Sequence, residues 1–314
     1  MGLLNRKRQV AAKVESTKGS PETLAAADAN ILAEVISFKI NREPLARDPI
    51  TSTLSRYVSL PSVSTMTLDI KVEIKGSGTA ATPPSWGKLL RGCGVSETAT
   101  TTVLYKPDSD DADSATLTMC VRIDGKDYLM YGARGNVRFS ATANQLVFAE
   151  FSFTGIFSDD TDTALFSGVS YETTVPPKFR ATSTTFNFGT AWSTSVYSDW
   201  TLDLGNTVSL RTNANSASGM AYAQIVERDP NGTFDLDTPL VATQDIYGHW
   251  GTPTTGSLAM EIGSAAGNHI SIAAPVFQIT DIAEGDRDGI ATSTISYHLR
   301  RSTAGDDEFT ITHA

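Results

Sequence analysis

The chain has 314 residues, which is long enough for two ordinary domains that each bury a core. Its 40% hydrophobic and 19% charged residues exclude a disordered chain, and the absence of an 18-residue apolar run excludes a membrane-spanning helix. The net charge is −10: residues 1–160 carry 18 basic and 18 acidic side chains, whereas residues 161–314 carry 7 and 17. Such a balance argues against tight binding of phosphate backbones, which requires a basic surface.

The chain begins with a basic arm, which we assign to residues 1–33. The arm has no hydrophobic stretch behind its positive charges, so we expect no secretory signal and a soluble protein made in the cytoplasm. A strand is predicted at Val35–Asn41. A second strand, Thr67–Lys75, alternates apolar and polar residues and has one buried and one solvated face. The connection between them, Glu43–Thr65, is unusually long for a hairpin loop, which suggests a function.

The rest of the first half is predicted to contain a short helix and further strands. Pro84–Cys93 has apolar residues at helical spacing and a proline near its start. Asp124–Gly125 predicts a tight hairpin turn, since both residues tolerate positive φ. Strands at Val137–Phe139 and Leu146–Phe153 complete a first domain, residues 34–157.

A linker is predicted at residues 158–183 and a second domain at 184–314. Trp200, Leu202 and Leu204 alternate as on a strand, and Tyr222–Glu227 predicts another. Asp229–Gly232 predicts a sharp turn. A helix is expected from Thr238 to about Trp250, and a pair of strands follows it.

The second half repeats the apolar pattern of the first about 141 residues later. Leu117 and Met119 correspond in this way to Leu258 and Met260, and the offset drifts to 144 where Phe153 falls opposite Tyr297. The order of predicted elements is also the same in both halves. The sequence therefore predicts two copies of one β-domain.

Residues that carry chemistry form no recognisable set. The acidic run 108–113 has carboxylates at alternating positions, but it lacks the glycine and distal glutamate of a calcium loop. The four histidines are scattered, and no nucleophile or phosphate-loop motif occurs. Cys93 and Cys120 are expected to be small apolar core residues, although a disulfide is possible. We expect no enzyme, and no catalytic, metal or cofactor site.

Several stretches resemble the tail tube (major tail) proteins of long-tailed bacteriophages and prophages. Their order along the chain is more specific than any one stretch, and they cover nearly the whole sequence. The stretches are Lys13–Pro21, Ala27–Leu32, Ile74–Ala80, Pro83–Gly94, Tyr131–Gly135, Leu202–Asn206, Gly263–Asn268 and Ala304–Thr312.

The resemblance implies a mainly β fold: two tandem tail-tube-like β-sandwich or barrel domains, each with one short flanking helix. It implies a structural virion protein of the tail that assembles into stacked rings around a hollow tube for DNA ejection. Two domains per chain suggest trimeric rings with pseudo-six-fold symmetry, with hexameric rings as the alternative. Partners would be further copies, the tape-measure, tail-tip and tail-terminator proteins, and DNA that passes without specific binding; no membrane is involved. The arm and the long loop would reach the adjacent ring or subunit, with contact residues Arg6, Lys7, Arg8, Lys13, Arg47, Arg56 and Tyr57.

Other functions stay open at this stage. A glycan-binding or glycan-hydrolysing β-sandwich would use an aromatic groove, for which Trp86, Trp192, Trp200 and Trp250 are candidates. Two of these, Trp86 and Trp250, lie on predicted helices and are expected to face the core. A capsid-decoration protein or the tube protein of a phage-derived injection system is closer in kind to a tail tube.

Overall fold

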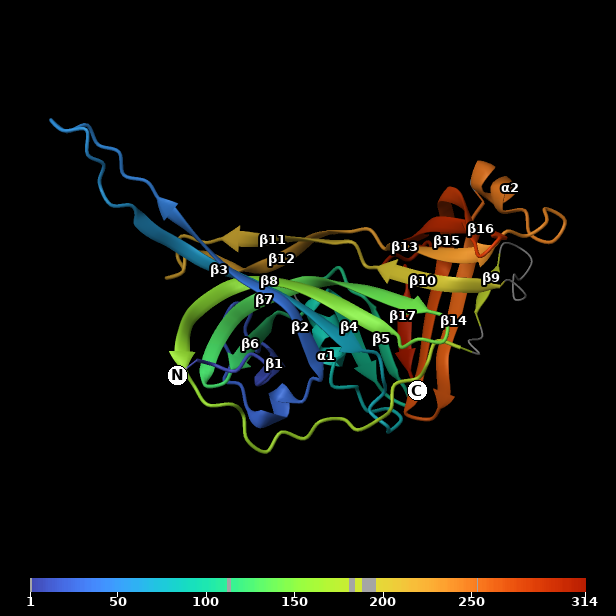
Figure 1. Ribbon diagram of the computed structural model, residues 1–314, viewed down its shortest axis with the longest axis horizontal. Helices are drawn as coiled ribbons and strands as arrows, with labels where there is room; N and C mark the ends of the chain where they lie inside the picture. Colours follow the sequence, from blue (N-terminus) through green and yellow to red (C-terminus); the bar gives the residue numbers. More distant parts are fainter. Residues whose placement is uncertain (1, 112–113, 181–183, 188–195, 253) are drawn as a thin grey trace.

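A computed structural model describes residues 2–111, 114–180, 184–187, 196–252 and 254–314. Within these residues the chain is mainly β, with seventeen strands, two short α-helices and one 3-10 turn. The prediction of a mainly β fold is confirmed (Figure 1).

The described residues of the first half form eight strands, the 3-10 turn η1 and the helix α1. In chain order they are β1 (Arg8–Val14), η1 (Ala26–Ala29), β2 (Ala33–Leu45), β3 (Leu60–Glu73), α1 (Gly87–Gly92), β4 (Val95–Ala99), β5 (Val103–Pro107), β6 (Leu117–Ile123), β7 (Lys126–Thr142) and β8 (Phe148–Asp162).

In the second half, the part that the structure describes forms nine strands and the helix α2. In chain order they are β9 (Thr185–Asn187), β10 (Tyr197–Asp203), β11 (Asn206–Thr212), β12 (Met220–Arg228), β13 (Asn231–Asp237), α2 (Ile246–Gly251), β14 (Gly256–Ala265), β15 (Asn268–Arg287), β16 (Ile290–Arg300) and β17 (Thr310–His313).

The two halves place their main strands in the same spatial order. The first half has the order β2-β3-β8-β7, and the second has β10-β13-β16-β15. Phe153 of β8 lies opposite Leu68 of β3, and Tyr297 of β16, 144 residues further on, lies opposite Gly232 of β13. The hairpin of β6 and β7 likewise corresponds to that of β14 and β15. We call each set of four strands a module.

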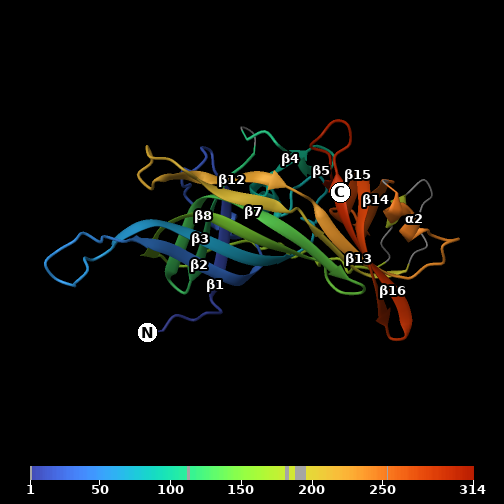
Figure 2. The same cartoon turned by 90° about the horizontal axis from the view of Figure 1, so that it is seen from above.

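The two modules are parts of one sheet, because β7 of the first pairs with β10 of the second (Figures 1 and 2). One hydrophobic cluster also runs through both halves, from Leu68 and Phe153 to Trp200 and Tyr297. The described residues of the two halves thus share a sheet and a core. The division into domains 34–157 and 184–314 stays a prediction from the repeated sequence pattern.

Most predicted elements have counterparts, with different ends. The strand expected to begin at Thr67 begins at Leu60, and β8 continues to Asp162, inside the predicted linker, because that end still pairs with β7. The rest of the linker runs without a long strand or helix through its described part, and residues 181–183 lie outside the described residues. The turn at Asp124–Gly125 is confirmed, with φ of 42° and 108°.

The prediction of a helix from Thr238 to Trp250 was too long. Only Ile246–Gly251 is helical, and the side chain of Asp245 caps it by accepting from the Gly248 amide at 2.8 Å. The preceding segment is used differently, since the Thr238 amide donates to the Ala291 carbonyl. The first-half prediction was closer: Pro84–Cys93 contains α1.

Both cysteines are buried and free, as expected for small apolar core residues. Burial raises the pKa of the Cys93 thiol well above its ordinary value, so the thiol stays protonated. Among the described residues, no helix has the length and apolar character needed to cross a bilayer.

Candidate functional site

The most informative contact is the junction of β7 with β10, where one module continues into the other. The strands are antiparallel, with Thr142 opposite Asp199 and Arg138 opposite Asp203. Trp200 and Leu202 of β10 are fully buried there. An edge strand that gains a partner in this way satisfies the backbone groups that an open edge would leave to solvent.

Polar side chains fix the register of this junction. Asn136 donates to the Asp203 carboxylate at 2.6 Å, and its own amide oxygen accepts from the Asn206 backbone at 3.0 Å. At the other end, Thr142 donates to Asp199 at 2.5 Å. A one-residue slip would break these bonds and turn the buried face of β10 to solvent, so the register is strongly specified.

The hairpin of β11 and β12 extends from the second module and lies across the first (Figure 1). The hairpin follows β10 and precedes β13 along the chain, and its two strands form a separate sheet. Its first residue, Asn206, donates to the Cys93 carbonyl at the end of α1 at 2.7 Å. Its tip lies beside β3, where Gly219 approaches Val63. The hairpin therefore spans the neighbouring module rather than its own.

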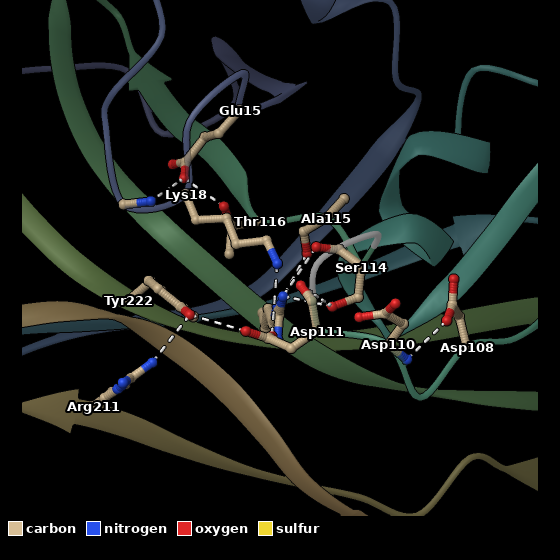
Figure 3. A network of polar contacts seen from close by, with 12 residues as sticks. Glu15, Lys18, Asp108, Asp110, Asp111, Ser114, Ala115, Thr116, Arg211 and Tyr222 are labelled. Atoms are coloured by element: carbon tan, nitrogen blue, oxygen red, sulfur yellow. Dashed lines mark hydrogen bonds and ion pairs between the residues drawn. The ribbon is translucent and has the colours of Figure 1, made fainter.

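Tyr222 of β12 is the anchor of this crossing (Figure 3). Its hydroxyl donates to Asp111 at 2.9 Å. The guanidinium of Arg134 lies 5.6 Å from the ring centre and the ammonium of Lys18 lies 6.0 Å from it, both within cation–π range. The backbone of Gly132, with φ of 58°, forms the floor, and a Cβ there would lie 3.1 Å from the Tyr222 Cα. We call these contacts the tyrosine socket.

A buried arginine holds the carboxylate that binds Tyr222 in the tyrosine socket. Arg134 is 2% exposed and donates to Asp111, to the Ala115 carbonyl and to both oxygens of Ser114. Burial alone would raise the pKa of Asp111, but the hydrogen bonds from Arg134 and Tyr222 outweigh it and lower that pKa. The charged carboxylate is therefore the form that holds the hairpin.

Glu15 forms a second buried centre beside it. Its carboxylate accepts from the amides of Gly19 at 2.7 Å and Gly132 at 2.6 Å, and from the hydroxyls of Thr116 and Thr118. These bonds tie the segment after β1 to β6 and β7. Because a buried carboxylate is costly without such partners, this network holds the floor of the tyrosine socket in one conformation.

The predicted contact residues fall into two separate groups. Arg6, Lys7, Arg8 and Lys13 lie in or just before β1, which pairs with β6. Lys7 forms an ion pair with Asp124 at 3.4 Å, and Lys13 forms one with Glu22 at 2.9 Å. The hydrogen bonds from Ser16 and Lys13 lower the pKa of Glu22 to about 2. Much of the predicted arm is therefore held against the first half.

Arg47, Arg56 and Tyr57 form the second group, on the connection between β2 and β3. This connection, residues 46–59, protrudes beyond the rest of the molecule (Figures 1 and 2) and we call it the protruding loop. Arg47 lies 5.6 Å from the centre of the Tyr57 ring, and Arg56 lies 3.9 Å from Asp48. The structure thus brings these three residues together and leaves them far from the basic residues of β1.

Sequence reasoning missed the tyrosine socket. Tyr131–Gly135 contributed only to a family resemblance, and Tyr222 was read as an ordinary strand residue. The available signal was Gly132 within a stretch that otherwise alternates as a strand, since such a glycine often marks a bulge or a close backbone approach.

Among the main strands of the two modules, two edges lack a partner strand in the described structure. The first is the outer edge of β2, which pairs only with β3. The second is the edge of β15 beyond Phe277, where the pairing with β14 ends while β16 still covers the other side. These edges correspond to the two that meet at the junction of β10 and β7. Val35 and Phe38 of β2 are only partly buried, whereas the matching Trp200 and Leu202 of β10 are fully buried.

The tryptophans do not form an aromatic groove in the described structure. Trp86 and Trp200 are 1% and 0% exposed, and Trp192 lies outside the described residues. The expectation that Trp250 faces the core was wrong: it is 41% exposed, because its indole N–H donates to the Thr280 carbonyl at the surface of β15. No group of three potential metal ligands occurs in the part of the chain that the structure describes.

The fold and the candidate site together define a mainly β protein in which a four-strand module occurs twice within one sheet. The family model of the phage tail tube protein matches residues 5–299, and the chain belongs to this family. It is therefore a structural component of the virion tail, from a family that self-associates into a tube. No curated protein matches the sequence.

Proposed function

We propose that copies of this chain join edge to edge into rings, and that the rings stack into the hollow tail tube through which DNA leaves the virion. The observation that carries the proposal is the junction of β7 with β10. The same two kinds of edge are open on β15 and β2, so a second copy can repeat outside the chain a contact that already exists within it.

The register of the internal junction transfers directly to the external one. β2 can be aligned with β10, and β15 with β7, because the strands next to them occupy corresponding positions in the two modules. This alignment places Glu34 of one copy opposite Arg287 of the next. Lys39 lies opposite Ala283 in the same alignment. Opposite charges at facing positions stabilise an antiparallel pair. Arg287 already forms ion pairs with Asp235 and Asp237 of its own chain, so Glu34 would join this group of charges.

Three copies per ring follow from two modules per chain if the tube has six modules in a turn. Each chain would contribute the module of β2 and the module of β10, and internal and external junctions would alternate around the ring. A ring of six chains is the alternative, and it would hold twelve modules.

We place the polar face of the shared sheet towards the lumen. Lys71 and Glu150 form an ion pair on this face in the first module. The second module adds Asp199, Asp203, Asp235 and Asp237, which alternate with its buried residues. A lumen with more acidic than basic groups repels phosphate, so DNA would pass without specific binding. The tape-measure, tail-tip and tail-terminator proteins would meet the ends or the interior of such a tube.

Contacts between rings or subunits are proposed for the predicted basic residues. Arg6 is exposed, whereas Lys7 and Lys13 already have acidic partners within the chain. Within this group we therefore assign contact with an adjacent ring mainly to Arg6, with Arg8 beside it. Arg47, Arg56 and Tyr57 are assigned to contact between copies.

Negative-stain microscopy of the purified protein tests the proposal. Rings or tubes with three chains per ring are expected, and ring mass from native mass spectrometry gives the copy number. Six chains per ring would refute the trimer, and monomers at every concentration would contradict assembly by this chain.

A matched pair of variants tests the edge itself. Ile36 on β2 is 53% exposed and Ile290, the first residue of β16, is 52% exposed, so neither substitution disturbs the core. Ile36→Lys places a charge in the edge strand, which blocks strand addition, and is expected to abolish rings. Ile290→Lys is expected to leave them intact. Equal assembly of both variants would exclude β2 as the joining edge.

A further inference from the structure

The protruding loop exposes more apolar surface than its own chain can cover. Ile50 and Leu54 are fully exposed, and Val58 is 83% exposed. Arg47 and Tyr57 form a cation–π pair near its base. A protein that stays soluble rarely presents such a cluster unless something binds it.

The second half contains a connection that corresponds to the protruding loop, and its path is known. The protruding loop connects β2 to β3, and the hairpin of β11 and β12 connects β10 to β13, which are the corresponding strands. Each connection also carries an arginine on its outgoing part and a tyrosine on its return. In the hairpin these are Arg211 and Tyr222, with 5.9 Å between the guanidinium and the ring centre.

The hairpin passes the end of α1 as it crosses the first module. Asn206 donates to the Cys93 carbonyl there, and Ile225 lies close to Gly94. The counterpart of α1 is α2, because each helix follows the second strand of its module and contacts β7 or β15 respectively. A loop that copied the hairpin's path on a second module would therefore pass α2.

The surface of α2 is suited to an apolar, basic segment. Tyr247 and Trp250 are 46% and 41% exposed, and their rings lie 6.2 Å apart. Tyr247 donates to Glu284 at 2.6 Å, and this hydrogen bond is the main reason that the pKa of Glu284 is lowered. Aromatic rings and a charged carboxylate thus lie side by side.

We propose that the protruding loop of one copy lies across the second module of the adjacent copy in the same ring, with its apolar side chains against Tyr247 and Trp250. Arg47 and Arg56 then lie near the acidic groups of β15, of which Glu284 is the closest to Tyr247. The contact rests on the proposed edge-to-edge ring, because β2 of the copy that donates the loop is the strand that joins β15 of the copy that receives it. It also refines the sequence expectation that the loop reaches the adjacent ring or subunit.

Disulfide cross-linking in assembled particles tests this contact. The variant Tyr57→Cys with Trp250→Cys is expected to give covalently linked chains on oxidation, since Cys93 and Cys120 are buried and do not compete. Because the contact closes within a ring, the ladder of linked species should stop at the number of chains in one ring. Tyr57→Cys with Tyr247→Cys should give the same ladder and serves if the first pair fails to fold.

The control pairs Tyr57→Cys with Ile290→Cys, which is equally accessible but lies outside the expected path; it should stay unlinked. A ladder that continues beyond one ring would place the loop on the adjacent ring and overturn the proposal. Rings in which neither tested pair links would overturn it as well, while leaving edge pairing intact. Absence of rings from the unmodified protein would remove the proposed function and this contact together.

Discussion

Replacing Arg134 by methionine should destabilise the folded chain by about 3 kcal/mol. The side chain is 2% exposed and donates four hydrogen bonds, one of them to Asp111. Breaking a buried ion pair costs roughly 3–5 kcal/mol, and the lower end applies here because Asp111 is 38% exposed and regains water. At about 2 °C per kcal/mol for a chain of this size, the midpoint of thermal unfolding should fall by roughly 6 °C.

Thermal and urea unfolding of the purified chain measure this effect, with Arg138→Met as the matched control. Arg138 lies four residues further along β7 but is exposed on the polar face, so its loss should change stability by less than about 0.5 kcal/mol. Equal losses in the two variants would refute the role given to the buried guanidinium. The role would also be refuted if, in the Arg134→Met variant, Tyr222 kept its native fluorescence and the backbone amides around it kept their protection from hydrogen exchange.

Two further results are expected from the described contacts. Burial lowers the pKa of His313, so the folded chain favours the neutral ring. The free energy of unfolding should therefore fall as the pH drops below about 6.5, where the unfolded chain takes up the proton. His313→Gln should flatten that slope in urea titrations from pH 7.5 to 5. Gly132→Ala should cost more than Gly289→Ala, because both have positive φ but only Gly132 has a backbone, that of Tyr222, against it; equal unfolding midpoints would show that the hairpin adjusts without cost.

The sequence was sufficient for the features that depend on local pattern. The alternation in Thr67–Lys75 and the Asp124–Gly125 turn each use neighbouring residues; the turn formed where expected, and the strand formed there too but with different ends, Leu60–Glu73. The repeat of apolar positions also corresponds to strands with matching partners, since Leu117 lies opposite Ala133 and Leu258 opposite Ala274. Such patterns are visible without knowledge of the fold.

The contacts of the candidate site depend on positions far apart in the chain. Tyr222 donates to Asp111 across 111 residues, and nothing near either residue indicates the other. The extent of α2 was misjudged for a similar reason, because Thr238 is recruited by the Ala291 carbonyl in a neighbouring strand. Tertiary pairing decided these cases over local helical spacing.

The continuity of β7 with β10 has a kinetic consequence. In a ring of three chains, three of the six junctions form within a polypeptide, where the tethered strands meet at an effective concentration of the order of millimolar. Only the other three junctions require separate molecules to meet. A ring therefore forms from three molecules, whereas six separate modules would require six. The same tether also creates a hazard: β10 of one newly made chain can pair with β7 of another, and the resulting domain-swapped dimer would satisfy every backbone bond of the correct fold.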